Sequence, residues 1–181
     1  MSNEQNQNAN ALDELFKKVD SVLAKVDLSK TTAESAGFED LKPGYYLCEV
    51  ASAKLVESKK THNPQIALTL SVIEDGFAFD DDDNKITYKG TKNRKIYKYY
   101  PLIDETTIKR FVSDMLKFED EDGESILPAE AFTTAETLSD SLDVIENMRV
   151  YTQITVSGEG ENKSNWISLI SWKRAAELEL V

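Results

Sequence analysis

Residues 65–72 read Q-I-A-L-T-L-S-V, and this stretch decides the fold class. Its apolar side chains, Ile66, Leu68, Leu70 and Val72, occupy every second position. Because successive side chains of a β-strand point to opposite faces of a sheet, this spacing predicts a strand with one buried face.

The same alternation recurs before and after this strand. It predicts further strands over residues 45–50, 94–100, 150–156 and 165–172. Between the third and the fourth strand, the period changes to that of a helix, with apolar residues at Ile108, Phe111, Val112, Met115 and Leu116. Weaker patterns predict short helices over 138–145 and 173–181.

The expected order of the main elements is therefore β-β-β-α-β-β. This is the order of the OB-fold, a small barrel of five strands. We predict a mainly β protein in which residues 43–181 form a five-stranded OB-like barrel with a helix between strands 3 and 4. An open meander with one helix is the structural alternative.

The N-terminal part has a different pattern. Residues 1–11 are rich in Asn and Gln and are predicted to be disordered. Residues 12–42 are predicted to form an amphipathic helix over 12–26, whose apolar residues repeat with 3-4-3-4 spacing, and then a linker. Two heptads are too few for a stable coiled coil, so we expect this helix to pack on its own domain or to dock on a partner.

Composition limits the class of protein. The chain has 181 residues, 21 basic and 33 acidic, with a net charge of −12. It has no run of 18 apolar residues and no signal-peptide pattern, so we expect no membrane span and a cytoplasmic location, in the host cell if the protein is viral. The single cysteine, Cys48, excludes an internal disulfide and a cysteine-based zinc site.

No constellation of catalytic residues is visible. His62 is the only histidine, and no glycine-rich phosphate-binding loop is present. The acidic loop Asp80–Asp83 resembles a calcium loop only at its start, because Lys85 stands where glycine is needed and Thr91 where a glutamate should close the shell. We therefore predict no enzymatic activity, no cofactor and no metal site, with the acidic loop as a solvated hairpin tip.

The run K-I-T-Y-K-G-T-K-N-R-K-I-Y-K-Y-Y, residues 85–100, is the main functional signal. It holds six basic residues, no acidic residue and four of the seven tyrosines, whereas the other 165 residues carry 15 basic and 33 acidic groups. Lysine and arginine neutralise phosphates, and tyrosine rings stack on unpaired bases. The run predicts a single-stranded nucleic-acid-binding surface; the alternative is an edge strand protected by lysines, with half-buried tyrosines.

Either face of the predicted strand 94–100 could bind the ligand. Arg94, Ile96, Lys98 and Tyr100 share one face, and Lys95, Tyr97 and Tyr99 share the other, so parity leaves open which tyrosines stack. A second basic patch lies in the turn between the first two strands, where a loop borders the binding face of OB-folds. The predicted nucleic-acid-binding residues are Lys59, Lys60, Tyr88, Lys89, Lys92, Arg94, Lys95, Tyr97, Lys98, Tyr99 and Tyr100.

The segments P-G-Y-Y-L-C-E-V (43–50) and S-K-K-T-H-N-P-Q-I-A-L-T-L-S-V-I-E-D-G (58–76) are similar to those of phage-encoded single-stranded-DNA-binding proteins with an OB-fold. With the later order of elements, the resemblance covers residues 43–172. It implies sequence-tolerant binding of single-stranded DNA in replication or recombination, without a cofactor. Such proteins usually end in an acidic tail, whereas this chain ends in S-W-K-R-A-A-E-L-E-L-V.

Several alternatives stay open at this point. RNA is a possible ligand beside DNA, and protein partners would use the helix 12–26 or the acidic segment 119–146. A different class of function also fits the acidity of the chain: a non-enzymatic protein-binding or virion structural component, or an acidic inhibitor that imitates DNA.

Overall fold

The computed structural model describes residues 40–120, 123–158 and 164–181. The chain divides into two units, Met1–Asp40 and Leu41–Val181, and all the described helices and strands belong to the second. The predicted disordered segment 1–11 and the predicted helix 12–26 lie outside the described residues.

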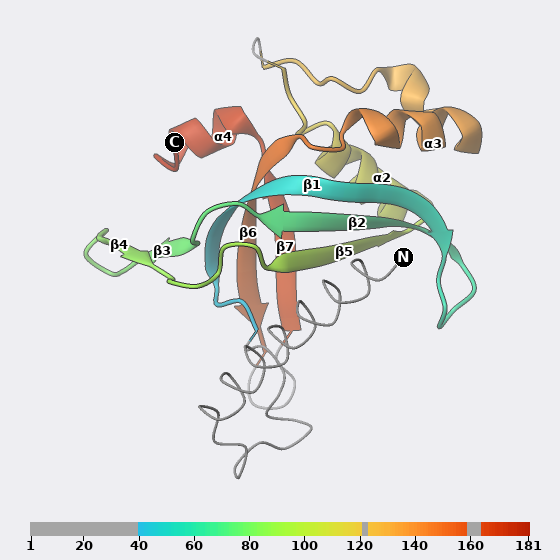
Figure 1. The fold of residues 1–181 in the computed structure, drawn as a ribbon. Coiled ribbons are helices and arrows are strands. Elements are labelled where there is room, and N and C mark those ends of the chain that lie inside the picture. The colour runs from blue at the N-terminus through green and yellow to red at the C-terminus, as the bar shows by residue number, and fades with distance from the viewer. Residues whose placement is uncertain (1–39, 121–122, 159–163) are drawn as a thin grey trace, which may run out of the picture. The chain divides into compact units, whose positions relative to one another are not determined.

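Seven strands and a few short helices make up the described unit (Figure 1). The strands are β1 (Gly44–Glu57), β2 (Pro64–Val72), β3 (Phe77–Phe79), β4 (Lys85–Thr87), β5 (Lys95–Pro101), β6 (Arg149–Ser157) and β7 (Ser164–Ile170). The helices are α2 (Glu105–Met115), the 3-10 helix η2 (Ala129–Phe132), α3 (Ala135–Val144) and α4 (Trp172–Glu177).

All strand pairs are antiparallel and belong to one sheet. The main path is β5-β2-β1-β6-β7, and the small β3–β4 hairpin is added at Tyr45 of β1. Within the described residues β5 pairs only with β2, and β7 only with β6, so each presents an unpaired edge. The sheet is therefore open.

Strand β1 serves both halves of the sheet. Its first part, Gly44–Glu49, pairs with β6, and its longer part, Cys48–Glu57, pairs with β2. A bulge between Val50 and Ser52 leaves Ala51 as the extra residue. Figure 1 shows β1 bending here, from the direction of β6 into the direction of β2, so that the two halves of the sheet cross.

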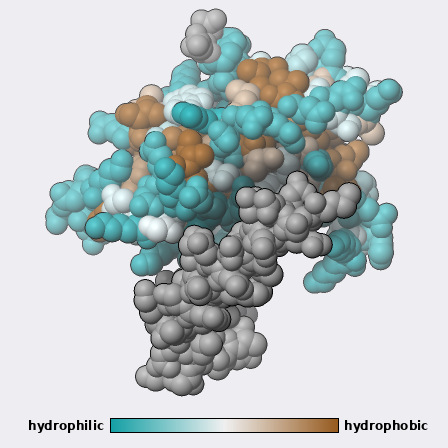
Figure 2. Space-filling model, viewed as in Figure 1, coloured by the Kyte–Doolittle hydropathy of each residue, from teal (hydrophilic) through white to brown (hydrophobic). Residues whose placement is uncertain are grey.

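The inner faces of both halves enclose the core. Ile66, Leu68, Leu70 and Val72 of β2 are buried, as their alternation predicts, and Tyr46, Cys48 and Val50 of β1 are buried with them. Helix α2 closes this core with Phe111 and Met115. The Phe111 and Tyr100 rings pack edge-on, with their centroids 5.4 Å apart. On the face drawn in Figure 2, hydrophobic residues form separate patches within a mainly hydrophilic surface.

The prediction of a mainly β fold is confirmed, but three finer predictions differ from the structure. The prediction of five strands was wrong, because the β3–β4 hairpin adds two. The predicted place of the helix, between strands 3 and 4, is not confirmed, because α2 follows β5; the basic run comprises β4, a loop over 88–94, and β5. A closed barrel is not confirmed, because no pairing between the edges of β5 and β7 occurs within residues 40–120, 123–158 and 164–181.

No helix among the described residues combines the length and the apolar character needed to cross a membrane.

Candidate nucleic-acid interface

Two tyrosines of β5 stand on the outer face of the sheet. Ile96 and Tyr100 point inward and are buried, which directs Tyr97 and Tyr99 outward. Each of these two tyrosine residues is 56% exposed. Lys95 lies in the same row and is also exposed, so β5 presents one cation and two aromatic rings on one face.

The neighbouring strand leaves room above these rings. Ser71, Thr69 and Ala67 of β2 pair with Lys95, Tyr97 and Tyr99, respectively. Directly paired residues of antiparallel strands share a face, and these three side chains are small. The outer face of β2 and β5 is therefore a shallow surface with its aromatic rings along the edge strand.

The loop before β5 is anchored by an acidic residue. The Asp75 carboxylate accepts hydrogen bonds from the backbone N–H groups of Thr91 and Lys92, at 2.9 and 3.0 Å. These bonds hold the pKa of Asp75 below its usual range, and the bond from Lys92 has the largest effect. The Thr91 hydroxyl accepts a bond from the Gly76 N–H at 2.8 Å, and a Cβ at Gly76 would lie 2.1 Å from the Tyr46 ring, which explains the glycine.

This anchoring leaves the lysines of the loop free of the core. Lys89 and Lys92 are exposed, and Lys92 lies three residues before Lys95. Arg94 is half-buried; its charge opposes the effect of burial on the pKa of Tyr46.

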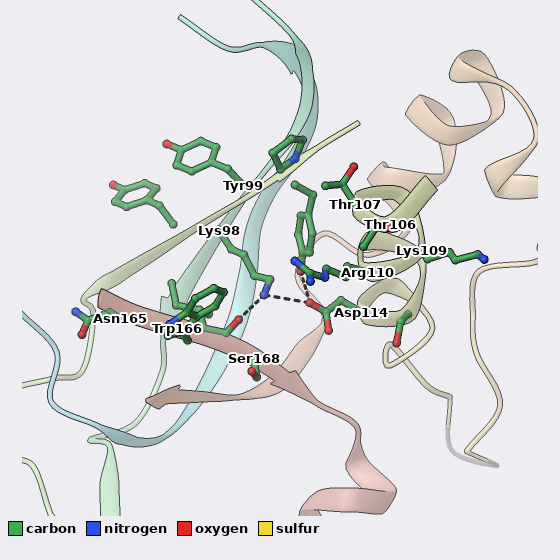
Figure 3. Close-up of a pocket in the computed structure, with 15 residues that line it drawn as sticks. Lys98, Tyr99, Thr106, Thr107, Lys109, Arg110, Asp114, Asn165, Trp166 and Ser168 are labelled. Atoms are coloured by element: carbon green, nitrogen blue, oxygen red, sulfur yellow. Dashed lines mark hydrogen bonds and ion pairs between the residues drawn. The ribbon is translucent and has the colours of Figure 1, made fainter. Parts of the chain in front are cut away.

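Lys98 occupies a different environment from the other lysines of the run. Its ammonium lies 3.1 Å from the Asp114 carboxylate of α2 and also donates to the Ile167 carbonyl of β7 (Figure 3). Lys117 approaches the same carboxylate at 2.6 Å, and the Tyr100 hydroxyl donates to it at 2.9 Å. Lys98 therefore joins β5, α2 and β7.

Two predicted stacking tyrosines are also engaged within the protein. Tyr100 is 5% exposed, and burial, followed by the charge of Asp114, raises the pKa of its hydroxyl. The Tyr88 hydroxyl donates to the Pro43 carbonyl at 2.8 Å, and its ring packs near that of Tyr46. Of the four predicted tyrosines, Tyr97 and Tyr99 are thus the two with accessible rings.

The second basic patch lies at the opposite end of the sheet. Lys59 and Lys60 are exposed in the turn between β1 and β2. This turn adjoins Pro64, whose neighbour Gln65 pairs with Pro101, whereas Lys95 pairs with Ser71. Six residues of strand, about 20 Å, separate the two patches, with Tyr97 and Tyr99 between them.

A groove beside β5 contains residues that the sequence analysis did not select. It has a volume of about 750 Å³ and lies between the edges of β5 and β7 and helix α2. Trp166 of β7 and Lys109 and Arg110 of α2 line it (Figure 3). Alternation in 165–172 did not show which face of β7 is exposed, so Trp166 could not be distinguished from a core residue.

The acidic loop has the geometry of a hairpin tip. One Asp80 carboxylate oxygen accepts hydrogen bonds from the backbone N–H groups of Asp82 and Asn84, at 3.0 and 2.8 Å. These bonds hold the pKa of Asp80 below its usual range, and the bond from Asn84 has the largest effect. Within the described ranges, no group of His, Cys, Asp and Glu could hold a metal ion.

Comparison with known proteins gives no family assignment: no protein-family model and no curated protein matches the chain significantly.

Proposed function

We propose that the protein binds single strands of nucleic acid, DNA in the first place, on the outer face of β2 and β5. The observation that carries this proposal is the exposed pair Tyr97 and Tyr99 beside Lys95. Rings at every second position of a strand lie on one face and can each stack on a base, which contributes about 1–3 kcal/mol per base.

The distribution of charge supports the same face. The run 85–100 carries six basic residues in a chain whose net charge is −12. Lys89, Lys92 and Lys95 are exposed at one end of this face, and Lys59 and Lys60 are exposed at the other end. Phosphates on either side of the stacked bases would meet cations, and binding would weaken as salt increases.

The proposal includes an OB-like arrangement of the strands. If the β3–β4 hairpin is counted as an insertion, the remaining main strands and α2 keep the order β-β-β-α-β-β. In OB-folds the second and third strands bind oligonucleotides, and β2 and β5 hold these positions in this order. The implied role is sequence-tolerant binding in phage-type replication or recombination.

A double variant tests the tyrosine platform, which is the exposed pair Tyr97 and Tyr99 on the outer face of β5. We expect Tyr97→Ala with Tyr99→Ala to weaken binding of a labelled dT12 oligomer roughly 30-fold or more, because two stacking contacts are lost. The matched control is Tyr97→Phe with Tyr99→Phe, which keeps both rings and should retain most of the affinity. Fluorescence anisotropy titrations measure both, and an alanine variant as tight as the wild type contradicts the proposal.

The same titration at two salt concentrations tests the lysines. Replacing Lys92 and Lys95 by alanine should lower the dependence of log affinity on log salt, by about 0.7 for each lost contact with a single strand. An rU oligomer and a duplex of equal length show whether DNA, RNA or duplex is preferred.

A protein-binding role is the second candidate. Ile108, Val112 and Leu116 form a stripe along α2, and Ile108 and Leu116 are exposed. An apolar hollow of about 330 Å³ adjoins the stripe and is lined by Phe132 and Leu138, among others. Retention of the protein on single-stranded-DNA cellulose at low salt favours the first function, and retention on an anion exchanger alone favours the second.

A further inference from the structure

The groove between β5, β7 and α2 is continuous with the tyrosine platform. Tyr97 and Tyr99 belong both to the outer face of β5 and to the rim of the groove. The unpaired edges of β5 and β7 form its two sides, and α2 forms its end. A bound ligand that lies on the platform therefore needs to cross only strand β5 to enter the groove.

Trp166 supplies an aromatic surface inside this groove. The residue is 59% exposed, although a tryptophan ring on a strand is usually placed to bury its large apolar area. The indole N–H donates to the Ser157 hydroxyl of β6 at 2.6 Å, which fixes the ring on the edge of the sheet. The ring is thus both accessible and held in one orientation.

The groove also has an excess of positive charge. Among the described residues, one carboxylate, that of Asp114, lines the groove together with three cations, and the Lys98 ammonium contacts that carboxylate at 3.1 Å. Arg110 of α2 extends toward the same place in Figure 3. Lys109 is paired with Glu105 at 2.6 Å, whereas Arg110, whose charge also acts on the Asp104 carboxylate at the start of α2, lines the groove with a fork that can receive a phosphate.

We propose that a single strand stacked on Tyr97 and Tyr99 crosses the edge of β5 and continues into this groove. There a further base stacks on Trp166, and Arg110 binds the adjoining phosphate. This inference rests on the proposed function and extends it, because it makes the binding path longer than the tyrosine platform and bends it around β5.

A peptide strand is a less suitable occupant of the groove. Unpaired strand edges can accept an added strand through backbone hydrogen bonds. Lys98 spans from β5 to the Ile167 carbonyl of β7, however, and so obstructs a strand that would pair with both edges. A rigid ring beside an arginine suits a nucleotide better.

The fluorescence of Trp166 tests the inference directly. Trp172 packs edge-on against Tyr151 at 5.5 Å, and Trp172→Phe keeps a ring in that position while leaving Trp166 as the single tryptophan. In this background we expect dT12 to quench the tryptophan fluorescence, because a base stacks on the indole. The oligomer dT4, short enough to be held by the platform alone, should quench it much less.

Affinity measurements provide the second readout. Arg110→Gln should weaken binding of dT12 by roughly tenfold and leave dT4 unaffected. Arg174→Gln is the matched control: it also removes one positive charge, but from α4, where Arg174 pairs with Glu177. Circular dichroism should show that both variants keep the wild-type fold.

The outcomes separate this inference from the proposed function. Suppose that dT12 binds and that the tyrosine double variant loses binding, but that dT12 does not change the Trp166 fluorescence and Arg110→Gln does not weaken binding. The groove is then not part of the binding path, and the proposed binding to Tyr97 and Tyr99 is still supported. If wild-type protein binds no oligomer, the proposed function fails and this inference with it. Quenching of Trp166 by a partner peptide instead of dT12 would assign the groove to protein binding and overturn the inference.

Discussion

Asp114 is the residue that links helix α2 to strand β5. Its carboxylate accepts from Lys98 of β5, from Lys117 beyond the end of α2, and from the Tyr100 hydroxyl. The Asp114 side chain is only 12% exposed, so these groups interact in a poorly solvated place. Removing one member leaves the others without compensation, which costs more than the interaction itself contributes.

The first stability prediction concerns this carboxylate. We expect Asp114→Ala to lower the free energy of unfolding by about 3–5 kcal/mol, because two ammonium groups and a hydroxyl lose their shared acceptor. Lys109→Ala is the control, since its pair with Glu105 is exposed and should contribute about 0.3–0.5 kcal/mol. Urea denaturation measures both; similar small losses would show that the Asp114 contacts do not hold the structure together.

At the scale of the elements, β1 is the strand that shapes the sheet. The buried positions are 46, 48 and 50 before the bulge, but 53 after it. This change from even to odd numbers occurs because Ala51 is an extra residue on one strand. The bulge thereby lets one strand pair with β6 at its start and with β2 along its remaining length.

Deletion of Ala51 tests the role of the bulge. The deletion restores a regular alternation of buried residues, so the pairing of β1 with β2 can persist without the extra residue. The bend should diminish, however, and with it the contact of Lys98 with the β7 edge. We expect the melting temperature to fall by about 2–4 °C or more, which corresponds to roughly 1 kcal/mol or more for a protein of this size.

A deletion elsewhere in the same strand pair is the control. Removing Thr61, which is exposed in the β1–β2 turn, should change the melting temperature less. Equal melting temperatures for wild type and the Ala51 deletion would mean that the bulge does not maintain the crossing of the two half-sheets.

At the scale of the whole molecule, burial of ionisable groups makes stability depend on pH. Burial raises the pKa of the Cys48 thiol to about 12, and burial also raises the pKa of Tyr46 to about 12. In the unfolded chain these groups lose their protons near their ordinary values, about 8.5 and about 10. Above these values the unfolded state binds fewer protons than the native state.

We therefore predict that the protein loses stability in alkaline solution. From about pH 8 to about pH 11, each of the two groups should lower the free energy of unfolding by up to about 1.4 kcal/mol per pH unit, once its unfolded form is ionised. Urea denaturation across this range measures the slope. Cys48→Ala should reduce the slope at the lower end, and an unchanged slope would show that the thiol does not contribute.

Much of the fold could be predicted because alternation is a local property. Ile66, Leu68, Leu70 and Val72 are buried at the positions that their spacing predicts, whereas the spacing in 45–50 predicted a strand without showing which face is buried. The hairpin tip at Asp80–Asp83 was predicted, but the strands β3 and β4 on either side of it were missed because three-residue strands are too short to show a period. The loop 88–94 was missed because its geometry depends on Asp75, which is distant in sequence.

By itself, the sequence determined that this protein is mainly β, which residues of β2 belong to its core, and that six of its 21 basic residues lie in one run. Only the tertiary structure decided what each member of that run does. Parity assigns residues to two faces, but a face is buried only when another element packs against it. The packing of α2 and the approach of β7 enclose Lys98 and Tyr100, expose Tyr97 and Tyr99, and bring Arg110 and Trp166 to the same groove.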